Sequence, residues 1–177
     1  MKKLVLVILI VIQNFNMFSQ GGWTWEEKSL MPFPTSNNGI TSAVVNDTTF
    51  VYSFGGITGG KTHEDIHSKA FRYNTISNVW DTIPNLPDSL GGLIALSANT
   101  IKNKIYIVGG YHVYANNSEI SSYEVFEFNP ETNSYSKKSN IPIAIDDQVS
   151  CVYKDSLLYI ISGWTSDLNP DANTNAV

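Results

Sequence analysis

The chain has 177 residues, of which 42% are hydrophobic and only 15% are charged, enough material for one ordinary domain. Its formal net charge is −5 and it has no basic cluster that could hold a phosphate backbone, so the composition argues against nucleic-acid binding. Aromatic residues make up 12% of the chain, which favours a β-rich protein over a helical one.

Residues 1–20 have the pattern of a signal peptide. Lys2 and Lys3 form a basic start, and the apolar run at 4–12 is too short to span a bilayer. Cleavage near residue 20 predicts a secreted chain, periplasmic or at the cell surface, with no stable membrane insertion after cleavage. An uncleaved N-terminal anchor with the same topology is the alternative.

An apolar run that ends in a pair of small residues occurs three times, at 51–56, 105–110 and 158–163. The last glycines of these runs are 54 and 53 residues apart. Three aromatic residues keep a spacing of 55: Trp25, Trp80 and Tyr135. A proline stands seven residues after each of them: Pro32, Pro87 and Pro142. Landmarks that recur at a nearly constant interval indicate an internal repeat.

Each repeat is expected to form four short strands with turns between them. The strands of the first unit are predicted at 40–46, 50–55, 69–73 and 79–83. Those of the second unit are predicted at 93–99, 104–109, 124–129 and 134–138. The third unit provides strands only at 149–154 and 157–162, and residues 23–30 are predicted as a lone fourth strand. After the signal peptide, the units therefore span about 23–83, 84–138 and 139–177.

These features resemble kelch repeats, including those of secreted bacterial kelch proteins and galactose-oxidase-like propellers. In each unit the glycine pair is followed by a strand that ends in Asn74 or Asn129, and an aromatic residue stands six positions later. Residues 31–34 also resemble a kelch turn, although Thr35 replaces the family's arginine. The resemblance covers about residues 23–165 and implies an all-β fold, a β-propeller of four-stranded antiparallel blades.

The number of repeats is small for a propeller. Residues 21–177 provide about 2.5–3 blades, whereas propellers have about four to eight. We therefore expect a segment of a kelch-type β-propeller whose ring is not closed, as in the N-terminal part of a longer propeller or in a truncated product.

Two short motifs suggest other chemistry, but the repeat accounts for them. Residues 55–62 match a phosphate-binding loop and residues 63–67 match the zinc motif H-E-x-x-H. Both motifs require a helix, whereas the repeat places a loop and then a strand here. We therefore expect no cofactor and no dedicated metal site, with adventitious binding of a divalent ion by the loop as a weaker alternative. The single cysteine, Cys151, is expected in the core, in register with Val44.

The resemblance also implies where a ligand would bind. In kelch propellers the loops between second and third strands gather on one face with the loops that join successive blades. Candidate ligand-binding residues on this face are Tyr111, His112, Tyr114, His63, Glu64, Asp146 and Asp147. The favoured function is binding of an unknown protein or glycan by a secreted kelch-repeat module. The alternative is the N-terminal part of a carbohydrate-active kelch enzyme such as a sialic acid mutarotase (N-acetylneuraminate epimerase-like), for which no catalytic residue is assigned.

Overall fold

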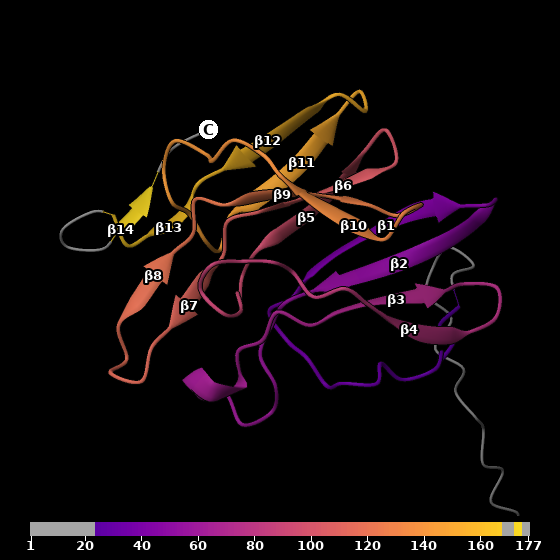
Figure 1. The fold of residues 1–177 in the computed structure, drawn as a ribbon, viewed down its shortest axis with the longest axis horizontal. Coiled ribbons are helices and arrows are strands. Elements are labelled where there is room, and N and C mark those ends of the chain that lie inside the picture. The colour runs from indigo at the N-terminus through magenta and orange to yellow at the C-terminus, as the bar shows by residue number, and fades with distance from the viewer. Residues whose placement is uncertain (1–23, 168–171, 175–177) are drawn as a thin grey trace, which may run out of the picture.

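A computed structural model describes residues 24–167 and 172–174, so the predicted signal peptide lies outside the described residues. The fold is all-β, as predicted, and its strands form small antiparallel sheets (Figure 1). The helical segment η1 (His63–Asp65) is a single 3₁₀ turn. Within the described ranges no helix has the length and apolar character needed to cross a membrane.

Two four-stranded sheets and one two-stranded sheet form the repeated part of the fold. Blade 1 has the strand order β1 (Gly39–Val45), β2 (Thr48–Phe54), β3 (Ala70–Asn74) and β4 (Val79–Ile83). Blade 2 consists of β5 (Ser97–Ile101), β6 (Lys104–Val108), β9 (Val125–Asn129) and β10 (Ser134–Lys137). Half-blade 3 consists of β11 (Val149–Tyr153) and β12 (Leu157–Ile161). Two further hairpins are β7 (Tyr111–Val113) with β8 (Glu119–Ser121), and β13 (Gly163–Thr165) with β14 (Ala172–Thr174).

The main core lies between blade 1 and blade 2. Tyr52 and Phe54 of β2 are fully buried, and Phe128 of β9 packs against both rings, with its centroid 5.8 Å and 5.6 Å away. The aliphatic side chains of Ile105 and Ile107 complete this layer from β6. Alternation along each strand places these residues on the two facing surfaces, so blade packing is the main source of buried apolar area.

The strand register defines equivalent positions in the three blades. Tyr52 lies opposite Thr41, Tyr106 opposite Asn99, and Tyr159 opposite Cys151. We call the surface that carries these three tyrosines the front face of each blade, and the opposite surface its back face. The front face of blade 1 packs on the back face of blade 2, and the front face of blade 2 packs on half-blade 3.

The expected burial of Cys151 is wrong. The register aligns Cys151 with Thr41 and Asn99, and not with Val44. Thr41 contacts blade 2 through Thr100, with 2.9 Å between the hydroxyl oxygens, whereas no described segment covers the front face of half-blade 3. The thiol is therefore exposed.

Most predicted strands lie within one or two residues of the observed bounds, but two differ more. Strand β5 begins at Ser97 and not at residue 93, because the preceding residues bond to neighbouring loops and Ala95 has a φ of 56°. Residues 24–30 form no strand. The indole of Trp80 nevertheless donates to Ser29 O at 3.0 Å, as the Tyr135 hydroxyl donates to Pro84 O at 2.8 Å. Both donors and both acceptors are 55 residues apart, so Ser29 lies against blade 1 as Pro84 lies against blade 2.

Candidate functional site

The long loops gather at one end of the sheets, which we call the loop face. Three isolated β-bridges repeat there. Each joins a loop that enters a blade to the residue after a pair of small residues that ends in glycine: Ser36 with Ile57, Ile94 with Tyr111, and Asp146 with Trp164. The second glycine of a pair also donates to the next loop, from Gly110 N to Ile145 O at 2.9 Å. A β-carbon on Gly110 would lie 2.8 Å from Ile94 O, so the glycine permits this close approach. The loop face is therefore held by backbone contacts between blades.

A second set of repeated contacts connects the three loops that enter the blades. Asn37, Ala95 and Asp147 all have left-handed backbones, with φ values of 58°, 56° and 50°. Ala95 N donates to Asn37 O at 2.8 Å, and Asp147 N donates to Ala95 O at 3.2 Å. These bonds run from one blade to the next and fix the backbone on which the candidate Asp147 stands.

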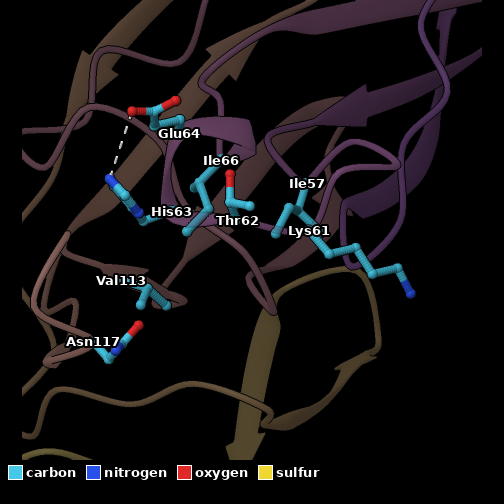
Figure 2. A pocket seen from close by; sticks show the side chains of 8 residues that line it. All are labelled: Ile57, Lys61, Thr62, His63, Glu64, Ile66, Val113 and Asn117. Atoms are coloured by element: carbon cyan, nitrogen blue, oxygen red, sulfur yellow. Dashed lines mark ion pairs between the residues drawn. The ribbon is translucent and has the colours of Figure 1, made fainter.

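A pocket of 500 Å³ opens on the loop face between loops of blade 1 and blade 2 (Figure 2). Its lining residues are Ile57, Lys61, Thr62, His63, Glu64, Ile66, Val113 and Asn117. The imidazole of His63 faces the Glu64 carboxylate, with Nε2 3.9 Å from Oε1. Two of the candidates proposed from sequence therefore lie in the wall of a pocket, and their role in ligand binding stays a prediction. Lys61, Val113 and Asn117 were not among those candidates because the contact between the two loops is not visible in the repeat pattern.

The residues that resemble a phosphate-binding loop surround a carboxylate of the protein itself. Asp65 accepts hydrogen bonds from the Thr58 hydroxyl at 2.8 Å, from Thr62 N at 2.9 Å and from the Thr62 hydroxyl at 2.7 Å. The two bonds from Thr62 and that from Thr58 lower the pKa of this carboxyl. A β-carbon on Gly60 would lie 2.3 Å from Asp65 Oδ2. The glycine and threonines of this motif therefore shape a tight loop around Asp65.

The two histidines of the zinc-like motif lie in different environments. The 3₁₀ turn ends at Asp65, and Ile66 is extended, with a ψ of 135°. His67 is buried, with Nε2 3.2 Å from the Thr35 hydroxyl and its ring 5.2 Å from that of Phe33. Burial lowers the pKa of His67, and nearby Lys69 lowers it further. In the described part of the chain, no group of three or more His, Cys, Asp or Glu side chains is placed to hold a metal ion.

A second group of candidates meets around the hairpin β7–β8. Asp146 is 2% exposed and accepts a hydrogen bond of 2.6 Å from the hydroxyl of Ser121. Burial raises the pKa of Asp146 to about 6, because the bond from Ser121 only partly offsets the loss of hydration and the charges of Asp147 and Glu119 add to the increase. Burial also raises the pKa of Tyr111, and the same three carboxyl groups raise it further.

Ser121 and Glu119 were not predicted, because only the pairing of β7 with β8 brings them to this group. The other two candidates on this hairpin, His112 and Tyr114, differ in their contacts. The Nδ1 atom of His112 donates to Gly92 O at 2.9 Å, and its ring lies 5.0 Å from that of Tyr114. Tyr114 itself is 41% exposed on the loop face. The hairpin is thus anchored at His112 and Asp146, while Tyr114 is accessible to a ligand.

Comparison with known proteins supports the repeat architecture. Residues 95–142 match the family model of the kelch motif. The solved structure of YjhT is similar, with a TM-score of 0.57 and 20% sequence identity over 76% of this chain. This chain covers 36% of the length of YjhT, and at this identity the likeness shows the fold alone. No curated protein matches the chain. Residues 95–142 therefore contain a kelch motif, and the described residues of the chain have the fold of part of a kelch-type β-propeller.

Proposed function

We propose that this chain is a secreted kelch-repeat module that binds a protein or a glycan on its loop face, in the periplasm or at the cell surface. The pattern of residues 1–20 supports secretion. The pocket between blade 1 and blade 2 is the observation that supports binding.

The pocket has the size and chemistry of a site for a small polar group. Its volume of 500 Å³ falls in the range of about 300–1,000 Å³ that small-ligand sites occupy. Aliphatic side chains line part of it, and Lys61, His63, Glu64 and Asn117 provide charged groups, donors and acceptors. A single sugar residue or a polar side chain of a peptide matches this combination. Hydrogen bonds within each loop hold both walls, those to Asp65 on one side and that from Asn117 N to Tyr114 O at 2.8 Å on the other, so little ordering is needed when a ligand binds.

The test is a binding screen of the full chain against a glycan array and a displayed peptide library. For any ligand found, Glu64→Ala and Asn117→Ala are each expected to weaken binding about tenfold, since each removes a polar partner from the pocket. Glu131→Ala is the matched control, because Glu131 is exposed in the turn between β9 and β10. A ligand whose affinity is unchanged by both pocket substitutions would show that it binds elsewhere and refute the assigned site.

The second candidate function is catalysis on a sugar, such as the anomerisation of sialic acid. One observation favours it: Asp146, with a pKa of about 6, carries a proton in part of the molecules near neutral pH, as a general acid or base must. However, Asp146 is only 2% exposed, so its carboxyl does not reach a substrate at the surface, and this argues against catalysis.

Catalysis is tested by following the anomers of N-acetylneuraminate by NMR in the presence of the full chain. An enzyme would speed their interconversion, and Asp146→Asn would abolish the effect. Interconversion at the rate in buffer alone would eliminate this candidate and leave the binding function standing.

A further inference from the structure

A second pocket lies beside blade 2, between the loop that enters this blade and the ends of β8 and β10. Its volume is 300 Å³, at the lower end of the range of about 300–1,000 Å³ that small-ligand sites occupy. Among the described residues, none lines both this pocket and the one in Figure 2. Its walls include Ser89, Tyr123, Glu124, Lys137, Asn140 and Asp167.

The equivalent space in blade 1 is filled by side chains. The ring of His67 lies 5.2 Å from that of Phe33, and Nζ of Lys69 lies 3.3 Å from the centre of the Phe33 ring. The residues 55 positions later, which is the spacing of β3 and β9 in the strand register, are Asp88, Ser122 and Glu124. Two ring-bearing side chains of the repeat are thus replaced by short polar ones.

These replacements leave space for the pocket. Asp88 bends back to its own loop, where Oδ1 accepts a bond of 2.8 Å from Gly91 N. Ser122 is buried, and its hydroxyl oxygen accepts a bond of 3.1 Å from Glu124 N. Neither side chain has the bulk of the Phe33 ring. Because the residues compared belong to the blades' own repeat units, the pocket is a property of the sequence of blade 2.

One wall of the pocket carries a buried ion pair. Glu124 is 8% exposed, its Oε1 lies 2.6 Å from Nζ of Lys137, and its Oε2 accepts a bond of 2.9 Å from Ser89 N. Burial acts to raise the pKa of Glu124, but the bonds from Lys137 and Ser89 outweigh it and lower the pKa, so the carboxyl is ionised at neutral pH. The Lys137 side chain is 56% exposed and keeps donors for a ligand. A buried ion pair adds little net stability, so recognition explains this one better than folding does.

The other wall has an accessible aromatic surface. Tyr123 is 37% exposed, and Ile120, which lines the same pocket, is 38% exposed. The Tyr123 hydroxyl donates to Oδ2 of Asp167, which also accepts a bond of 3.3 Å from Ala144 N. These bonds hold the aromatic ring at the wall, with part of its surface open to the pocket.

We propose that this pocket binds a neutral sugar residue. A pyranose has C–H groups on the faces of its ring and hydroxyl groups around its edge. In the proposed complex it lies against the Tyr123 ring, while its hydroxyls donate to Glu124 and accept from Lys137. Because the lining residues carry two carboxyl groups and one ammonium group, an anionic sugar is disfavoured. This site is independent of the ligand proposed for the pocket in Figure 2.

The first test is saturation-transfer NMR of the full chain with the methyl glycosides of glucose, galactose, mannose and N-acetylglucosamine. At least one of them is expected to bind with a Kd of about 1 mM, the affinity typical of so small a ligand. N-acetylneuraminate, which is anionic, is expected not to displace it. The proposal would be overturned by displacement with N-acetylneuraminate, or if no neutral glycoside bound at about 10 mM.

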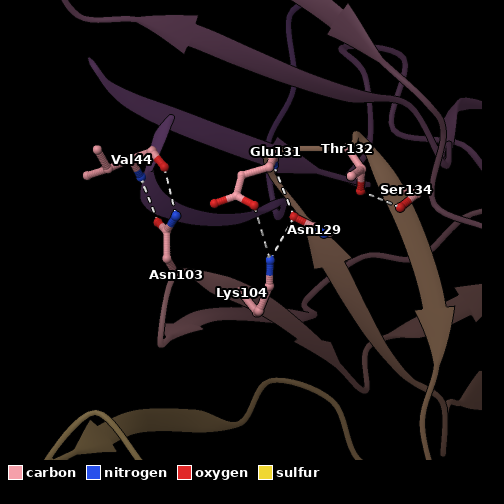
Figure 3. Close-up of polar contacts among 7 residues, drawn as sticks. All are labelled: Val44, Asn103, Lys104, Asn129, Glu131, Thr132 and Ser134. Atoms are coloured by element: carbon pink, nitrogen blue, oxygen red, sulfur yellow. Dashed lines mark hydrogen bonds and ion pairs between the residues drawn. The ribbon is translucent and has the colours of Figure 1, made fainter. Parts of the chain in front are cut away.

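Substitutions in the two walls locate the bound sugar. Tyr123→Ala is expected to weaken binding about tenfold, because it removes the surface on which the sugar lies. Lys137→Met removes the donor but keeps the length of the side chain, and should weaken binding by a similar factor. Lys104→Met is the matched control, since Nζ of Lys104 lies 3.9 Å from Oε2 of Glu131 and 2.9 Å from Oδ1 of Asn129 at the other end of blade 2 (Figure 3). Circular dichroism melting verifies that each variant is folded.

The pattern of affinities decides between this site and others. A loss in either wall variant that the control does not share supports the site. Affinity that is unchanged in both Tyr123→Ala and Lys137→Met would overturn the proposal, as would an equal loss in Lys104→Met. Affinity that is reduced by Glu64→Ala instead would place the sugar in the pocket of Figure 2. That result would support the binding function proposed above and overturn the second site.

Discussion

The junction between blades 1 and 2 and the junction between blade 2 and half-blade 3 are built from equivalent positions but differ in chemistry. Aromatic and aliphatic side chains fill the first junction, and Tyr52 there is 0% exposed. In the second, the equivalent Tyr106 donates to the Glu127 carboxylate at 2.9 Å, and Asn99 bonds Ser150. Tyr159, the third equivalent residue, is 42% exposed.

The three tyrosines show that the environment of a repeated residue depends on what packs against its face. Burial is the main cause of the raised pKa of Tyr52, which Arg72 partly offsets. For Tyr106 the bond to Glu127 adds to the effect of burial and raises the pKa further. We therefore expect the first junction to provide most of the stability and the second to open more easily.

The largest predicted effect is on the first junction. Phe128→Ala removes a ring that is 0% exposed and lies 4.8 Å from the ring of Tyr135. We expect a loss of about 4 kcal/mol in the free energy of unfolding, measured by urea denaturation, because the cavity lies in the main core. Tyr159→Ala is the matched substitution on the uncovered face and should cost less than about 1 kcal/mol at low protein concentration. Equal losses for the two variants would contradict the difference between the faces.

The next largest effect is expected at the glycine that joins blade 2 to half-blade 3. Gly110→Ala should destabilise the chain by about 3 kcal/mol, because it combines an unfavourable backbone with a close contact to Ile94 O. Gly91→Ala is the control: Gly91 has a similar φ of 89°, but nothing lies within 4 Å of the added carbon. If both variants lose the same stability in thermal melts, the close contact with Ile94 O does not explain the need for glycine at position 110.

The third prediction concerns pH at the loops of the second junction. The pKa of Asp146 is about 6 in the folded chain, against an ordinary value of 3.8, so the folded state holds this proton more tightly than the unfolded state does. This group therefore lowers stability as pH rises from about 4 to about 6. Asp146→Asn removes the effect while keeping an acceptor for the hydroxyl of Ser121.

Urea denaturation at several pH values measures the difference between this variant and the wild type. The stability of Asp146→Asn relative to wild type should increase across this interval and then level off above pH 6. A difference that does not change with pH would show that Asp146 ionises normally in the folded chain.

The smallest predicted effect is on the polar contact of the second junction. Asn99→Ala removes the bonds between Asn99 and Ser150 and should cost about 1 kcal/mol. A double-mutant cycle with Ser150→Ala isolates the coupling between the two side chains. A coupling energy near zero would mean that this contact does not hold half-blade 3 on blade 2.

Much of the fold could be predicted from the sequence, because the glycine pairs and the aromatic spacing reflect backbone geometry that every blade shares. The strand Val79–Ile83 has the predicted bounds. The start of β5 and the orientation of Cys151 were predicted wrongly, because they depend on bonds between loops and on strand register. A one-residue change in register turns a side chain to the other face, so spacing in sequence alone does not determine which face Cys151 occupies.

The candidate site was predictable only in part. His63 and Glu64 lie in the pocket wall, and Asp146 lies beside Tyr111, as expected for residues of loops at one end of a propeller. The contributions of Asn117 and Ser121 depend on how the hairpin β7–β8 packs against its neighbours, which no local pattern indicates.

Hydrogen exchange of the backbone amides, measured under native conditions at low protein concentration, tests the difference between the two junctions most directly. We predict that amides bonded between β11 and β12 exchange through openings of much lower free energy than those bonded between β6 and β9. Exchange from both pairs of strands at the same opening free energy would show that half-blade 3 unfolds together with the main core, and would contradict the account.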